Sequence, residues 1–322
     1  MGKHFINLLV ILLAGTGSSY AQRMHHTASF RKIEANAYFR FHYDNDYFTK
    51  TDEYYSQGIT VEYVHPSAKK FPLATFLYRP FTSTPAYGLG INLFGYTPTS
   101  ILSDSILYGD RPFDANISLQ TFLIQEDPAR KRQISVALSL GIMGPAAQGY
   151  EIQYGIHKWL NNPLPHGWQY QVKNDIIVNY QVNYEKQLKG SGKHFLLNST
   201  AEARLGTLNT SLGGGFNFMA GRFNKRYALK EEIKKKAAYY FYGQGRVNIV
   251  GYDASLQGGL FNKESPYTIP SADLSRLTFQ ADAGVIINFK KFYLSYTQSF
   301  ISKEFTTGKT HRWGGMSMGF AL

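Results

Sequence analysis

The stretch Leu277–Phe289, with the sequence LTFQADAGVIINF, decides the fold of this chain. Its odd-numbered residues are all apolar, whereas its even-numbered residues include the polar Thr278, Gln280, Asp282 and Asn288. A repeat of two residues is the period of a β-strand, whose side chains point alternately to two faces. The stretch therefore predicts a long strand with one apolar face and one polar face.

Similar alternation recurs in about twelve segments, many of them longer than the roughly five or six residues of ordinary strands. They lie near 33–44, 55–65, 87–96, 114–126, 131–143, 169–186, 193–206, 208–222, 238–252, 274–289, 290–302 and 311–322. A membrane-spanning strand needs about 9–11 residues. Tyr and Phe, which favour strands, are frequent at 24 and 23 residues. Together these features predict an all-β fold, a transmembrane antiparallel up-and-down β-barrel of about 12 strands.

A soluble β-sandwich also alternates, but its inner faces are apolar. Here Arg40, Glu62, Arg246 and Asp282 fall on the faces that would form such a core. The polar lumen of a barrel accepts them. The chain has no cysteine, and a closed barrel needs no disulfides because every strand is paired.

The N-terminus predicts export. Lys3 precedes the apolar run FINLLVILLAG (5–15), which is shorter than a transmembrane helix, and Ser19 and Ala21 match a signal-peptide cleavage site. We expect residues 1–21 to be a signal peptide and 22–322 to be one outer-membrane barrel domain.

The formal net charge of +12 is compatible with binding to nucleic acid, but export to the outer membrane argues against such a partner. Much of the excess lies in RFNKRYALKEEIKKK (222–236). Such a run is usually a solvated loop, and the alternative is contact with anionic lipid headgroups or phosphates.

The polar stretch NDYFTKTDEYYSQG (45–58) connects the first two predicted strands. If the N-terminus starts in the periplasm, this connection lies on the extracellular rim. Extending the alternation of both strands places Asp46 and Ser56 on the same inner face.

A later connection on the same rim contains a predicted short helix over residues 147–160. Gln153 and His157 are four residues apart and therefore share a helix face. No HExxH motif accompanies them, so a zinc pair is not indicated. Imidazole can take a proton from water near neutral pH, which makes His157 a candidate base.

With these motifs in view, the chain resembles the outer-membrane lipid A 3′-O-deacylases, the LpxR family. The resemblance is carried by NDYF…TDEYYSQG (45–58), YTP…GDRPF (96–113), GPAAQGYEIQYGIHKWL…PHGW (144–168) and FTTGKTHRWGGMSMGF (305–320). It covers most of the chain after the signal peptide, in order. It implies a twelve-stranded barrel that uses calcium to hydrolyse the 3′-linked acyloxyacyl ester of lipid A.

The resemblance also implies a role for each matching residue. His157 would be the general base, and Asp46 would hold calcium, which polarises the ester carbonyl. Asn45, Ser56 and Gln153 would position water, substrate or base. The family can carry an acidic residue shortly after the histidine; this chain has none there, and Glu151 is a possible ligand or only a helix residue.

The implied substrate is lipid A within lipopolysaccharide, at a monomeric barrel among outer-membrane lipids. Arg111, the only basic residue of 96–113, is the candidate contact for a lipid A phosphate. Two alternatives stay open. One is a phospholipase-like serine esterase with Ser56 as nucleophile, and the other is a narrow porin or adhesin without enzymatic activity.

Overall fold

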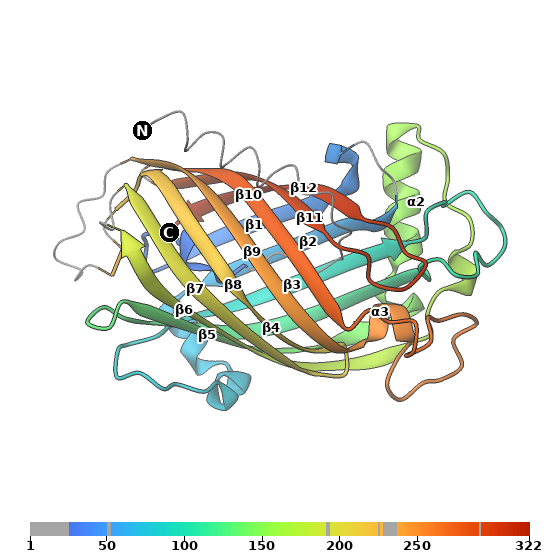
Figure 1. Ribbon diagram of the computed structural model, residues 1–322, viewed down its shortest axis with the longest axis horizontal. Helices are drawn as coiled ribbons and strands as arrows, with labels where there is room; N and C mark the ends of the chain where they lie inside the picture. The colour runs from blue at the N-terminus through green and yellow to red at the C-terminus, as the bar shows by residue number, and fades with distance from the viewer. Residues whose placement is uncertain (1–25, 50–52, 191–193, 225, 228–236, 290) are drawn as a thin grey trace.

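Twelve antiparallel strands close into a single barrel in the computed structural model of the protein (Figure 1). The structure describes residues 26–49, 53–190, 194–224, 226–227, 237–289 and 291–322. The predicted signal peptide and most of the basic run 222–236 lie outside these residues. Each strand pairs with its neighbours in sequence, and β1 pairs with β12 to complete the ring. The predicted up-and-down barrel is confirmed, and the sandwich alternative is excluded.

The strands are β1 (Tyr38–Asn45), β2 (Tyr54–Val64), β3 (Ala86–Thr97), β4 (Asp114–Asp127), β5 (Arg132–Met143), β6 (Asp175–Gly190), β7 (Phe195–Gly206), β8 (Asn209–Arg222), β9 (Ala238–Asp253), β10 (Leu277–Phe289), β11 (Phe292–Ile301) and β12 (His311–Ala321). The α-helices are α2 (Gly149–Leu160) and α3 (Ala254–Gln257). The short 3₁₀ helices are η1 (Ser29–Arg31), η2 (Asp46–Thr49), η3 (Pro66–Lys70), η4 (Pro72–Phe76), η5 (Pro145–Ala147) and η6 (Trp168–Tyr170). None of the described helices is long and apolar enough to cross a membrane.

The alternation that predicted the strands also sets their burial. In β10, Leu277 and Phe279 are exposed on the outer face, whereas Thr278, Gln280 and Asp282 are buried on the inner face. An apolar outer surface and a polar interior are what a lipid-embedded barrel requires.

Two predicted strands begin five or six residues later in the structure than the alternation indicated. The strand expected near 33–44 begins at Tyr38, because the residues before it enter the lumen. The strand expected near 169–186 begins at Asp175 and runs to Gly190, since η6 occupies residues 168–170. In both places the alternation of apolar and polar residues extends beyond the strand. The extra residues pack against the barrel wall and form no part of its hydrogen-bonded ladder.

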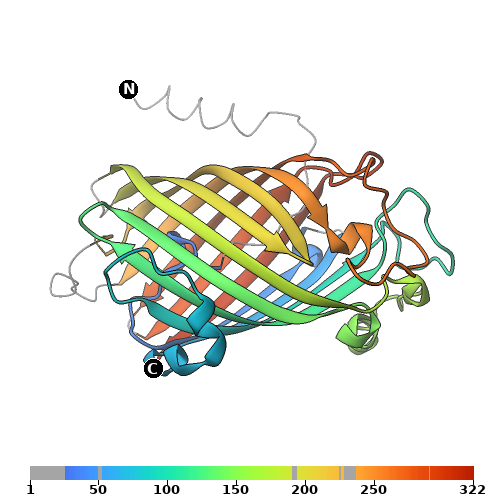
Figure 2. The same ribbon diagram turned by 90° about the horizontal axis from the view of Figure 1, so that it is seen from below.

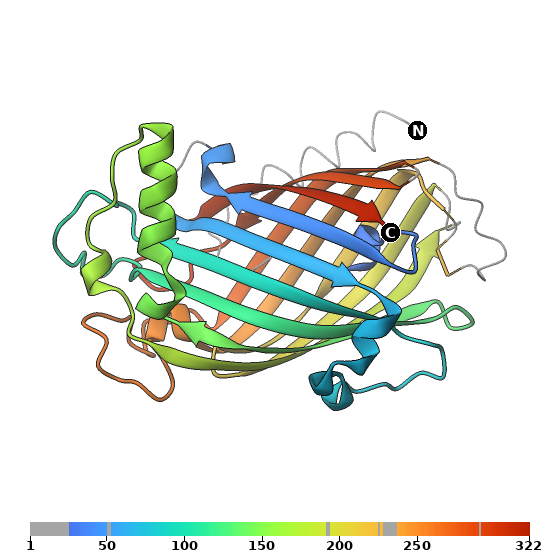
Figure 3. The ribbon, with the colours of Figure 1, turned by 180° about the vertical axis from the view of Figure 1, so that it is seen from behind.

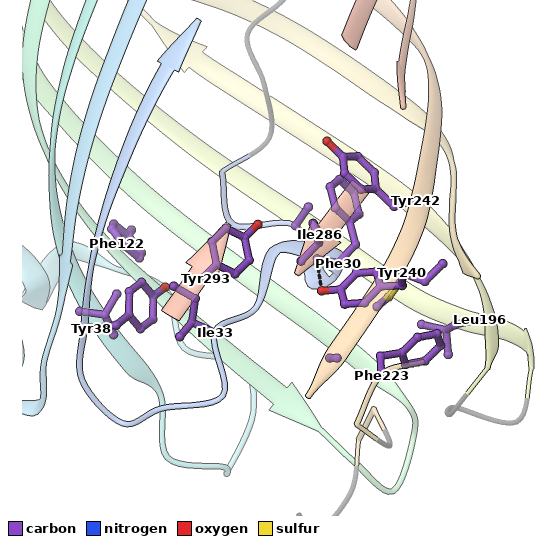
Figure 4. Packing of buried hydrophobic residues seen from close by; sticks show 14 of the residues in the cluster. Phe30, Ile33, Tyr38, Phe122, Leu196, Phe223, Tyr240, Tyr242, Ile286 and Tyr293 are labelled. Atoms are coloured by element: carbon purple, nitrogen blue, oxygen red, sulfur yellow. Dashed lines mark hydrogen bonds between the residues drawn. The ribbon is translucent and has the colours of Figure 1, made fainter. Parts of the chain in front are cut away.

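The N-terminal segment 26–37 fills part of the lumen. The ring of Phe30 stacks on the ring of Tyr242, with 4.2 Å between their centroids. The backbone carbonyl of Phe30 accepts a hydrogen bond from the Tyr240 hydroxyl (Figure 4). The Ser29 backbone N–H donates to Glu185 of β6 at 2.8 Å, and Arg31 donates to Ser317 of β12, six strands away in the ring of twelve, at 2.7 Å. Because these contacts span the barrel, the segment acts as a plug.

Buried charges of the lumen are paired, as the barrel prediction requires. Arg40 and Glu62 lie 2.5 Å apart across β1 and β2, and both are 2% exposed. Arg246 lies 3.4 Å from Glu202 and 3.8 Å from Asp282. Removing one partner of such a pair would leave the other charge buried without a partner. Each pair therefore fixes the relative position of the β-strands that carry it.

The two ends of the barrel differ. The helix α2, the short helix α3 and the segment η2 gather at one end, whereas β12 ends at the other end, where η3 and η4 also lie (Figures 1 and 3). Figure 2 shows α2 at the rim, clear of the strands that tilt across the barrel. The end with α2 carries the connections predicted for the extracellular rim.

Candidate active site

The side chain of Asn45 holds together the two ends of the first rim connection, between β1 and β2. Its amide nitrogen donates to the Ser56 carbonyl at 2.7 Å and to the Tyr43 hydroxyl at 3.0 Å, and its oxygen accepts from the Tyr47 N–H at 2.7 Å. The Asn45 side chain thus holds the end of β1 against the start of β2. This geometry makes Asn45 a positioning residue for Ser56.

Ser56 occupies a β-bulge. The register of β2 against β3 shifts between Tyr55 and Gln57, which leaves Ser56 as the extra residue. Ser56 is buried, and its Oγ lies 2.5 Å from Oγ1 of Thr97. Bulges re-aim side chains near active sites and break strict alternation. The alternation that predicted an inward-facing Ser56 is therefore interrupted at the bulge. Ser56 is nevertheless buried, in agreement with the predicted inner position.

The backbone just before the bulge is also unusual. Tyr54 has a φ of 66°, in the left-handed region that non-glycine residues rarely adopt. Such conformations cluster at functional sites, where surrounding contacts hold them. Here the Tyr54 hydroxyl accepts a hydrogen bond from the Lys309 N–H at 2.9 Å.

Beneath Asn45, three buried side chains form a hydrogen-bonded chain. The ring of His42 lies 2.7 Å from Asp44 Oδ1 through Nε2 and 2.7 Å from Ser317 Oγ through Nδ1. Arg31 of the plug donates to the same Ser317 oxygen at 2.7 Å. Asp44 also accepts from the Tyr55 hydroxyl at 3.3 Å. This chain connects the plug to the wall that carries the rim residues, and each of its three side chains is at most 2% exposed.

Asp46 begins η2 and is buried. Its Oδ2 accepts from the Glu53 N–H at 2.7 Å, and its backbone carbonyl accepts from Thr49 Oγ1 at 2.7 Å. Within the described residues no group of three or more His, Cys, Asp or Glu side chains could hold a metal ion. The Asp46 carboxylate is a hard oxygen donor, so it suits a hard cation such as calcium better than a soft metal.

The helix α2 starts and ends at residues that adopt left-handed backbone conformations. Gln148 precedes it with a φ of 58°, and Asn161 follows it with a φ of 56° and donates its N–H to the carbonyls of His157 and Lys158. Asn is a favoured residue for this capping role. Gly149 permits the close approach to the barrel, because a Cβ there would lie 2.4 Å from the Cβ of Ala115. The predicted helix is confirmed, starting two residues later than expected.

Gln153 and His157 lie one turn apart on α2 and are both held by the loop that follows it. The Gln153 carbonyl oxygen accepts from Trp168 Nε1 at 2.7 Å. The Nδ1 atom of His157 lies 2.6 Å from the Pro163 carbonyl oxygen. A carbonyl can only accept, so Nδ1 donates, and in the neutral imidazole the free lone pair is then on Nε2.

The two halves of the predicted site lie on the same rim but make separate contacts. Asn45 and Ser56 are joined directly. Among the described residues, the side-chain hydrogen bonds of Gln153 and His157 reach Trp168 and Pro163 and none reaches the first hairpin.

Arg111 occupies a different setting from the one expected for a phosphate contact. It is 1% exposed, forms an ion pair with Glu304 and donates to Ser255 Oγ at 2.6 Å. Its guanidinium also lies 4.2 Å from the centre of the Tyr96 ring. Burial lowers the pKa of this guanidinium. These contacts favour a role in joining the rim connections to each other.

Sequence reasoning did not single out Thr97, Pro163, Trp168 or the His42–Asp44–Ser317 chain. Thr97 closes β3 opposite the bulge, and Pro163 and Trp168 orient α2 through contacts that no local pattern encodes. Only His42 and Asp44 had a sequence signal, because both are polar residues on the inner face of β1.

Comparison with known proteins gives a consistent result. The family described as "Outer membrane protein LpxR" matches residues 7–322. The structure is similar to that of LpxR from Salmonella typhimurium, with a TM-score of 0.72 and 18% identity, covering 88% of this chain and 100% of that one. The β domain of the Bordetella autotransporter BrkA is a more distant barrel, with a TM-score of 0.44 and 9% identity over 89% of this chain and 98% of that one. No curated protein sequence matches the chain.

The family match spans nearly the whole chain, and the similar structure shares the closed barrel. This chain is therefore an outer-membrane β-barrel protein of the LpxR family.

Proposed function

We propose that the protein is a lipid A deacylase that hydrolyses the 3′-linked acyloxyacyl ester in a calcium-dependent reaction, with His157 as the general base. Membership of the LpxR family supports the reaction class. The observation that carries the mechanism is the contact between His157 and Pro163, because it places the proton of the neutral imidazole on Nδ1 and leaves Nε2 as the nitrogen that can accept a proton from water.

The proposed reaction is a direct attack by water. Nε2 of His157 takes a proton as the water oxygen bonds to the ester carbonyl carbon. The tetrahedral intermediate then expels the sugar oxygen at the 3′ position, and the imidazolium returns the proton to it. The products are the free acyloxyacyl acid and a 3′-hydroxyl group, so no covalent enzyme intermediate forms.

The other rim residues have positioning roles in this proposal. Trp168 engages the oxygen of Gln153, which leaves the Gln153 amide nitrogen as a donor for the developing oxyanion. Asn45 and Thr97 keep Ser56 in its bulge, where its hydroxyl can orient water or substrate. Asp46 would hold calcium together with backbone carbonyls and water, and the ion supplies Lewis-acid polarisation of the ester carbonyl.

An apolar surface for the acyl chains adjoins the base. Trp159 and Leu160 follow His157 on α2 and are 82% and 51% exposed. Exposed aromatic and apolar side chains at a membrane rim favour contact with lipid. In our proposal Leu160, one helical turn after His157, guides the acyl chains of lipid A toward Nε2, and Trp159, on another face of α2, contacts lipid at the rim.

The two alternatives have less support. A porin needs an open channel, whereas the plug around Phe30 crosses this lumen from wall to wall. A serine nucleophile at Ser56 needs an adjacent base, whereas its hydroxyl faces Thr97. A monomer agrees with the closed barrel, which has no free strand edge to pair with another chain.

Mass spectrometry of lipid A tests the proposal. Purified protein in detergent is incubated with lipid A, with calcium or with a chelator, as wild type, His157→Ala and His166→Ala. His166 is a matched control, since it lies on the same rim, 50% exposed and 3.0 Å from Asp104. We expect loss of one acyloxyacyl unit with wild type and His166→Ala in calcium, and no loss with His157→Ala. Equal activity of the two variants would refute the assigned base.

A further inference from the structure

The end of the barrel opposite α2 contains a cavity of about 790 Å³. It lies between the plug and the ends of β1 to β4, with Tyr38, Val64, Tyr87 and Glu126 among its lining residues. Its volume is within the range of small-molecule sites, roughly 300–1,000 Å³. Because the proposed deacylase site is on the other rim, this cavity has no part in that reaction.

The lining is strongly cationic. Six basic side chains reach the cavity, namely Arg31, Lys32, Arg40, Lys69, Arg79 and Arg226. Within the described residues, three carboxylates pair with members of this set: Glu62 with Arg40, and Glu34 and Glu126 with Lys32 and Arg226. Lys69 and Arg79 have no carboxylate partner within the described residues, so at least two positive charges of the lining are not neutralised. Such an excess in a concave site attracts anions.

Buried donors in the lining are also unused. The Nε atom of Arg226 and the hydroxyl of Ser83 are buried and have no hydrogen-bond partner among the described residues. Arg226 is itself 5% exposed. A buried donor without an acceptor is costly, so an anionic oxygen in the cavity would complete both groups. The positive excess and the unused donors are separate observations that indicate the same ligand class.

The segment that supplies Lys69 and Arg79 also contacts the outside of the barrel. Ala74 and Leu77 of this segment pack with Val136 on the outer wall, and the Tyr78 N–H donates to the Tyr180 hydroxyl at 2.9 Å. On the same segment Phe76 and Tyr78 are 67% and 61% exposed. Exposed aromatic residues beside cations are typical of a membrane interface.

We propose that this cavity, at the periplasmic mouth of the barrel, binds a phosphate-bearing ligand. The interfacial position of residues 66–81 favours the headgroup of an anionic phospholipid of the periplasmic leaflet as its source. Lys69 and Arg79 would contact the phosphate first, since both are exposed and neither pairs with a carboxylate within the described residues. Arg226 and Ser83 would supply the inner donors.

Native mass spectrometry of the purified full chain tests this site. The probes are a phosphatidylglycerol, a phosphatidylcholine with the same acyl chains, and sn-glycerol 3-phosphate. The site variant is Lys69→Gln/Arg79→Gln. The control is Lys70→Gln/Arg130→Gln, which removes the same two charges from exposed residues that do not line the cavity. All four side chains are exposed, so both variants should fold.

We expect wild type and control to retain phosphatidylglycerol in preference to phosphatidylcholine. The site variant should lose this preference by about 30-fold, the effect of two cations near an anionic lipid. Retention of glycerol 3-phosphate alone, lost in the same variant, would support the site with a soluble source. Failure to retain either phosphatidylglycerol or glycerol 3-phosphate in preference to phosphatidylcholine, or equal loss in the site variant and the control, would overturn the proposal.

Discussion

The Nδ1 atom of His157 and the carbonyl oxygen of Pro163 lie 2.6 Å apart, and this contact assigns the free lone pair to Nε2. His157→Asn should keep an N–H donor near the Nδ1 position but has no basic nitrogen. We expect deacylation to fall about 10²–10⁴-fold, the usual contribution of a general base, while the unfolding temperature stays unchanged. Initial rates on lipid A measure the effect, with His166→Asn as the control. An active His157→Asn enzyme would contradict the assignment.

Ser56→Ala separates a positioning role from a nucleophilic one. The substitution removes the contact with Thr97 Oγ1. If Ser56 only orients water or substrate, the rate should fall by about fivefold, because a neutral hydrogen bond contributes about 1 kcal/mol. Intact-protein mass spectrometry during turnover should show no acylated enzyme. An acyl adduct on Ser56 in the wild type would instead establish the serine esterase alternative.

Asp46→Asn tests the proposed calcium site by binding as well as by activity. Removing the only carboxylate assigned to the ion should weaken calcium affinity by about tenfold or more, measured by titration calorimetry. Asp104→Asn is the matched control, since Asp104 is a rim carboxylate that is 77% exposed and pairs with His166. Unchanged calcium affinity in Asp46→Asn would remove Asp46 from the ligand set.

Gly58→Ala should destabilise the first hairpin. A Cβ at Gly58 would lie at about the position of the Tyr55 hydroxyl, which donates to Asp44. Tyr55 also packs against Phe94 and Trp313, so it cannot move freely. We expect a loss of about 1–3 kcal/mol in the free energy of unfolding, measured by urea denaturation in detergent.

The matched control for that variant is Gly155→Ala. A Cβ at Gly155 on α2 meets nothing within 4 Å. Because alanine is favoured over glycine by about 1 kcal/mol in a helix, the control should not lose stability. Equal destabilisation by both substitutions would argue against the steric explanation.

Arg111→Gln distinguishes a structural arginine from a substrate contact. It would leave Glu304 buried without its ion-pair partner, at a cost of about 3–5 kcal/mol. Glu304→Gln should cost a similar amount, since it breaks the same pair. Thermal unfolding measures both. A stable Arg111→Gln variant with a raised KM for lipid A would instead support the phosphate contact predicted from the sequence.

The alternation of apolar and polar residues determined the barrel, the number of strands and most of their bounds. This was possible because one face of a lipid-embedded strand contacts lipid and the other faces the polar lumen. In Leu277–Phe289 apolar and polar residues therefore alternate with a period of two. The inner-face positions of Arg40 and Glu62 follow from the same alternation, whereas their pairing with each other is known from the structure. The helix α2 was also visible from its local sequence.

Only the tertiary structure decided how the rim is assembled. Ser56 lies in a bulge and contacts Thr97, and Nδ1 of His157 contacts the Pro163 carbonyl oxygen. No local periodicity in the sequence specifies these partners. Residues 33–37 of the plug were wrongly predicted to be strand, because a segment that packs against a wall can alternate as well as one that pairs with it. Sequence patterns report the environment of each side chain, whereas the identity of its partner depends on the closure of the whole barrel.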